Sequence, residues 1–62
     1  MPLLVATSSV SLVESLRLAL EAEGIPAAVT NEHMAPFQPI KVEVRHEDYE
    51  RAKAILATLQ VT

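Results

Sequence analysis

Residues 10–30 read VSLVESLRLALEAEGIPAAVT, and this stretch decides the fold because it holds a helix, the end of that helix and a following strand. Between Val10 and Glu23 the apolar residues recur at helical spacing, which predicts an amphipathic helix. Gly24 can adopt the left-handed conformation that ends many helices, and Pro26 prevents the helix from continuing. The predicted buried stripe consists of Leu12, Val13, Leu16, Ala19 and Leu20.

Strands are predicted on both sides of this helix. Four consecutive apolar residues, Leu3 to Ala6, precede a run of hydroxyl residues, which is typical of a short strand buried on both faces. Ser8 or Ser9 is expected to cap the helix, since a serine hydroxyl oxygen can accept a backbone N–H of the first turn. Residues 27–30 predict a second strand mainly from their context, because alanine has a low strand propensity.

Residues 40–45 predict a third strand, because apolar and charged side chains alternate along them. One face of this strand is expected to point into the core, and it carries Ile40, Val42 and Val44. The other face is expected to meet water or a partner, and it carries Lys41, Glu43 and Arg45.

A second helix is predicted to begin at His46, Glu47 and Asp48, where the acidic side chains suit the positive end of the helix dipole. Glu47 and Arg51 have the spacing and order of a favourable i,i+4 ion pair. The predicted buried stripe of this helix consists of Ala52, Ile55, Leu56 and Leu59.

These elements predict a single two-layer domain over residues 1–62, in the order βαββα, with both helices on one face of a small sheet. The right-handed crossover rule favours the third strand between the first two. A fourth strand after the second helix is absent or reduced to Val61 and Thr62.

The first strand is then an apolar edge without a charge or bulge, and such edges tend to pair. We therefore expect a homo-oligomer, with a dimer as the simplest form, built through this edge or the open sheet face; alternatively, terminal residues cover the edge.

Composition excludes several classes of protein. The net charge is −3 and the basic residues are interleaved with acids, which argues against binding nucleic acid through its phosphates. No apolar run is long enough for a spanning helix and no secretory signal is visible, so a cytoplasmic protein without a membrane partner is expected. The chain has no cysteine and one glycine, which leaves no disulfide and no glycine-rich phosphate loop. The serines lie without a nucleophile elbow, so we expect no enzyme and no cofactor.

The segment between the second and third strands is the candidate partner-binding loop, since loops on a rigid scaffold often carry function. Its polar residues Asn31, Glu32 and His33 form either a recognition tip or a simple polar turn. Met34 and Phe37 either pack back on the core or serve as an exposed anchor. A strand of six residues separates His33 from His46 by roughly 20 Å, so a metal site holding both is expected only across a dimer, if at all.

Three further stretches carry a family resemblance: residues 20–27 (LEAEGIPA) with Asn31-Glu32-His33 after them, Val42-Glu43-Val44, and residues 47–52 (EDYERA). Together they resemble a family of small bacterial signal-transducing proteins with a domain of unknown function. The resemblance implies a ferredoxin-like fold of the type found in PII signalling proteins, and it implies no site residue, because the family has no established activity. The expected function is a protein-binding or regulatory module; the alternative is a small-ligand or metal sensor with its site at an oligomer interface.

Overall fold

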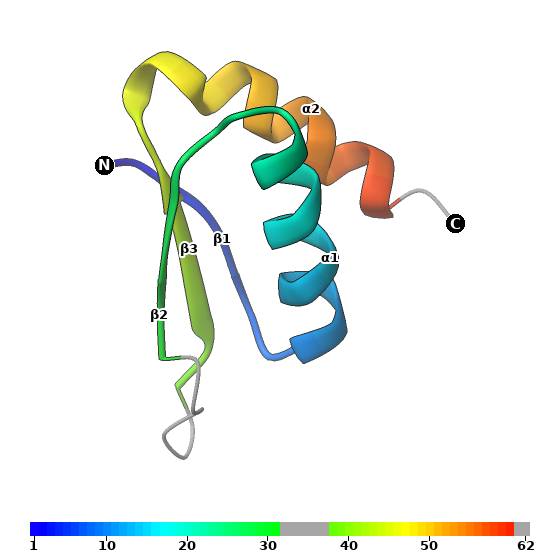
Figure 1. The fold of residues 1–62 in the computed structure, drawn as a ribbon. Helices are drawn as coiled ribbons and strands as arrows, with labels where there is room; N and C mark the ends of the chain where they lie inside the picture. Colours follow the sequence, from blue (N-terminus) through cyan, green and yellow to red (C-terminus); the bar gives the residue numbers. More distant parts are fainter. Residues whose placement is uncertain (32–37, 61–62) are drawn as a thin grey trace.

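The computed structural model describes residues 1–31 and 38–60, and its elements follow the predicted order (Figure 1). The described residues form three strands, a short 3-10 helix and two α-helices. They are β1 (Leu3–Thr7), α1 (Val10–Ala22), β2 (Ala27–Thr30), β3 (Ile40–Val44), η1 (His46–Asp48) and α2 (Tyr49–Gln60).

The sheet has the strand order β1-β3-β2, and both neighbouring pairs are antiparallel. The predicted central position of the third strand is therefore confirmed. Both helices lie on the same side of the sheet, which confirms the two-layer α+β architecture (Figure 1). The suggestion that Val61 and Thr62 form a fourth strand falls outside the described residues. No helix in the described part of the chain is long and apolar enough to cross a membrane.

β1 contains an irregularity that the sequence did not reveal. Leu3 is opposite Glu43 and Val5 is opposite Val42, so the register shifts at Leu4 and two residues of β1 match one of β3. Leu4 is buried and Val5 packs against the core, whereas Leu3 is 46% exposed. The predictions of a strand buried on both faces and of an edge without a bulge were therefore wrong. Helices cover only one face of the sheet, and the bulge turns two consecutive side chains towards that face.

α1 begins and ends with hydrogen bonds that its sequence predicts. The Ser9 hydroxyl oxygen accepts the backbone N–H of Leu12 at 3.2 Å, which selects Ser9 as the cap. At the other end Gly24 has φ +72° and its N–H donates to the Glu21 carbonyl at 3.0 Å. The Ile25 N–H donates to the Leu20 carbonyl at 2.9 Å, which completes a Schellman motif. The helix ends at Ala22, one residue before the predicted limit.

Gly24→Ala is expected to lower the free energy of unfolding by about 1 kcal/mol, because a Cβ makes the left-handed conformation unfavourable. The added methyl would meet no atom within 4 Å, so the loss arises from the backbone alone. Urea unfolding followed by circular dichroism measures this loss. Gly24→Asn is the matched control, since asparagine tolerates positive φ, and it should lose less. An alanine variant as stable as the parent would contradict this role of Gly24.

The core lies between the sheet and the two helices. α1 buries Val13, Leu16 and Leu20, β3 buries every second residue, and α2 contributes Ala52 and Leu56. The predicted stripe residues Leu12, Ile55 and Leu59 pack at its margin and are only partly buried. In the part of the chain that the structure describes, the buried cluster consists of ten apolar residues, namely Leu4, Val13, Leu16, Leu20, Ile25, Ile40, Val42, Val44, Ala52 and Leu56. As far as residues 1–31 and 38–60 show, no helix covers the other sheet face and no further strand pairs with the outer edges of β1 and β2.

Candidate functional site

The base of the β2–β3 loop is closed by Asn31. Its side-chain amide donates to the Pro39 carbonyl at 3.2 Å and to the Gln38 side-chain oxygen at 3.4 Å, so it joins the two ends of the loop. Asn31 also has φ +63°, a left-handed conformation that asparagine tolerates better than most residues. Asn31 thus holds the loop base together. The other predicted site residues, Glu32, His33, Met34 and Phe37, lie outside the described residues.

Asp48 is a buried carboxylate at the end of η1, with its side chain 8% exposed. The Arg45 Nε–H donates to Asp48 Oδ2 at 2.8 Å, and Arg51 Nη1 lies 4.0 Å from Asp48 Oδ1. The hydrogen bond with Asp48 raises the pKa of Arg45 above its ordinary value, because it favours the charged guanidinium. Arg45 was predicted to project from the open sheet face, but it is instead engaged with Asp48 beyond the end of β3.

Arg51 links the start of α2 to the end of α1. Its Nη2–H donates to the Glu23 backbone carbonyl at 3.2 Å, and the same nitrogen lies 3.6 Å from the Glu23 carboxylate. Glu23 is the C-cap of α1, where exposed carbonyl groups favour a cation. The predicted pairing of Arg51 with Glu47 was wrong, since Glu47 lies 4.0 Å from Arg45 instead. Asp48 and these arginines therefore form a structural cluster that connects η1, the start of α2 and the end of α1.

The metal-site hypothesis concerned His33 and His46. His33 is outside the described residues, and His46 is exposed at the first position of η1. Among residues 1–31 and 38–60, no three histidine or acidic side chains are grouped closely enough to hold a metal ion.

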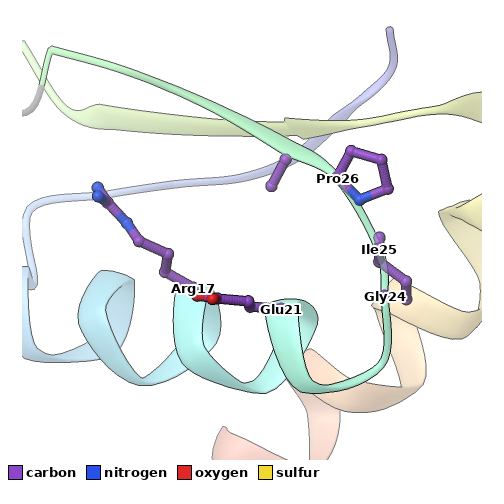
Figure 2. A pocket seen from close by; sticks show the side chains of 6 residues that line it. Arg17, Glu21, Gly24, Ile25 and Pro26 are labelled. Atoms are coloured by element: carbon purple, nitrogen blue, oxygen red, sulfur yellow. The ribbon is translucent and has the colours of Figure 1, made fainter.

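α1 lines two of the hollows in the described part of the chain. The larger, of about 290 Å³, lies between α1 and the start of β2 and is lined by Arg17, Glu21, Gly24, Ile25, Pro26 and Ala27. Figure 2 shows the Arg17 side chain extending from α1 at one end of this hollow, with Pro26 at the other end. The smaller, of about 230 Å³, is lined by Ser11, Leu12, Ser15 and Leu59. Sequence reasoning missed both, because it treated residues 24–26 only as a helix stop and the serines only as helix-start residues.

The open face of the sheet consists of two rows of three residues, one from each strand. Leu3, Glu43 and Ala28 are opposite one another in the first row, and Ala6, Lys41 and Thr30 form the second. Lys41 is exposed as predicted, whereas Glu43 is half-buried between its neighbours. The alternation along β3 predicted its two charged residues, but the residues beside them depend on the strand pairing.

Comparison with known proteins identifies one family. The family described as "Putative prokaryotic signal transducing protein" matches residues 1–60, almost the whole chain. No curated protein and no solved structure matches the chain significantly. The match covers every strand and helix described above, from β1 to α2. This chain therefore belongs to the family described as "Putative prokaryotic signal transducing protein".

Proposed function

We propose that this protein is a non-catalytic regulatory module that binds an extended segment of a partner protein along the outer edge of β2. The family description supports a regulatory role. The observation that carries the proposal is the regular, uncharged edge of β2 beside the larger hollow.

The edge of β2 has the properties of a strand that accepts another strand. Among residues 1–31 and 38–60, β2 pairs only with β3, and four consecutive residues pair without a register shift. Its side chains, from Ala27 to Thr30, are small or apolar and none is charged. An outer strand presents unpaired backbone N–H and C=O groups, and charges or bulges are the usual means of blocking it. β1 carries a bulge at its start, so β2 is the more receptive edge.

The hollow beside β2 supplies a place for a side chain of the added strand. Alternate side chains of a strand point to the same face, so every second residue of the partner would point towards the helical side. There it would meet Pro26 and Ala27, with Arg17 and Glu21 on the adjoining flank of α1. A volume of about 290 Å³ is slightly below the range of roughly 300–1,000 Å³ for small-molecule pockets. It therefore suits one side chain of a bound segment better than a whole metabolite.

Affinity capture from a prokaryotic host lysate, with quantitative mass spectrometry, tests this function. Ala27→Phe places a large ring in the hollow and is expected to reduce recovery of the partner at least tenfold, since a tenfold loss needs only about 1.4 kcal/mol. Ala57→Phe, at an exposed position of α2, is the matched control and should capture the partner as the parent does. Equal recovery with Ala27→Phe would count against the β2 edge.

The alternative function, a small-ligand or metal sensor at an oligomer interface, gives a different result. A metabolite or metal that binds the folded protein raises its melting temperature. A reproducible shift with one compound in such a screen, together with no captured protein, would favour the sensor over the protein-binding module.

A further inference from the structure

We infer that two copies of this chain associate face to face through the open side of the sheet, with Lys41 of each copy against Glu43 of the other. This inference is independent of the proposed function, because it uses the sheet face and leaves the β2 edge and its hollow accessible.

The first observation is the state of the two charges. Within residues 1–31 and 38–60, Arg45 and Arg51 form ion pairs with Glu23, Glu47 and Asp48. Lys41 and Glu43 take part in none of these pairs. Glu43 is half-buried between Leu3 and Ala28, and the partial loss of water around a carboxylate is unfavourable unless a cation compensates it.

The second observation is the self-complementarity of the two rows. A two-fold axis that runs between the rows, parallel to them, places the row of Glu43 over the row of Lys41 of the other copy. Each Glu43 then meets a Lys41, and this happens twice, as an isologous interface requires. The same operation places Leu3 over the smaller Ala6, and Ala28 over Thr30. Large side chains thus meet small ones, as close packing of two sheets about 10 Å apart requires.

The size of the face determines the expected strength of the association. Three strands spaced about 4.8 Å apart, two of five residues and one of four, present a planar area of roughly 230 Å². A stable interface usually buries about 800 Å² per partner, so we expect a weak and reversible dimer that forms only at high protein concentration. Because the central contacts are ion pairs close to solvent, salt should weaken it further.

Pairing through the β1 edge is the competing arrangement. The bulge between Leu3 and Val5 interrupts the regular spacing of that edge, which is one way in which proteins prevent strand pairing. The edge arrangement also gives Lys41 and Glu43 no role, so substitutions at these two positions separate the two interfaces.

Sedimentation equilibrium of the full chain, from micromolar to millimolar concentration, tests the inference. The average mass of the parent protein is expected to rise towards the dimer, and added salt should reduce this rise. Lys41→Glu and Glu43→Lys each place like charges together and should raise the dimer Kd more than tenfold. The double variant Lys41→Glu/Glu43→Lys restores both ion pairs and keeps the net charge at −3, so it should dimerise as the parent does.

Two controls carry the same changes of charge at exposed helical positions, namely Lys53→Glu on α2 and Glu14→Lys on α1, and both should dimerise normally. Circular dichroism confirms that each variant is folded. A parent protein that stays monomeric throughout the concentration range would overturn the inference. Single reversals that dimerise normally, or a double variant that stays monomeric, would overturn it as well.

Discussion

Leu16→Ala is expected to lower the free energy of unfolding by about 3 kcal/mol, which would leave a substantial fraction of the protein unfolded at moderate temperature. Leu16 has no exposed surface and lies in the middle of α1, in contact with the core beneath it. Removing its side chain leaves a cavity, and a domain of this size has few other contacts to compensate. Since 1 kcal/mol corresponds to about 4–8 °C in a small domain, the melting temperature should fall by roughly 10–20 °C.

The control for this prediction lies two residues along the same helix. Leu18 is 66% exposed, so Leu18→Ala removes the same atoms with little change in buried area and should alter stability by less than about 0.5 kcal/mol. Urea unfolding at low protein concentration, where any dimer dissociates, measures both values. Equal losses for the two variants would mean that the buried face of α1 is assigned incorrectly.

The helix α1 was predictable because the information lies within the helix itself. Its apolar spacing places Leu16 and Leu20 on one face, the serines provide a cap, and Gly24 permits the backbone conformation that ends it. Each of these signals involves residues at most a few positions apart. The alternation along β3 is equally local, and it correctly separated the core residues from Lys41 and Glu43.

Features that depend on contacts between distant segments were not predictable in the same way. Leu3 to Ala6 are all apolar, so no alternation could show where the bulge lies; the register against β3 determines it. Arg51 was assigned to Glu47 because the i,i+4 rule considers only its own helix. Its partner Glu23 is 28 residues away and comes within reach only when α1 and α2 pack together.

The candidate functional surfaces likewise differ in how far local sequence patterns could predict them. The sequence identified the loop that starts at Asn31, and the structure shows that the amide of this residue closes the loop base. The hollow beside β2 is lined by residues of α1 and by residues 24–27, which follow the helix. Sequence patterns explained Gly24 and Pro26 only as the residues that end the helix. The open face likewise combines two residues from each strand, so its complementarity becomes visible only with the strand pairing.

The second large effect is expected at Asp48. Asp48→Ala should lower the free energy of unfolding by about 2 kcal/mol, because hydrogen bonds to charged groups are stronger than average and Asp48 holds Arg45 at 2.8 Å. The carboxylate is the buried member of the cluster, whereas the side chains of Arg45 and Arg51 are about half exposed and stay hydrated when it is removed. This hydration keeps the expected loss below the 3–5 kcal/mol typical of a fully buried pair.

Two further substitutions test the source of this stabilisation. One removes only the charge of Asp48, and the other removes the neighbouring acid Glu47. Asp48→Asn keeps the size and one carbonyl oxygen that can accept from Arg45, so it should lose about half as much stability as Asp48→Ala. Glu47→Ala removes an acid with a side chain 70% exposed, 4.0 Å from the same arginine, and should change stability by less than about 0.5 kcal/mol. Thermal and urea unfolding of the three variants measure the order. An equal loss of stability in Glu47→Ala and Asp48→Ala would contradict this account. It would mean that burial of the Asp48 carboxylate is not the reason why Asp48 stabilises the fold.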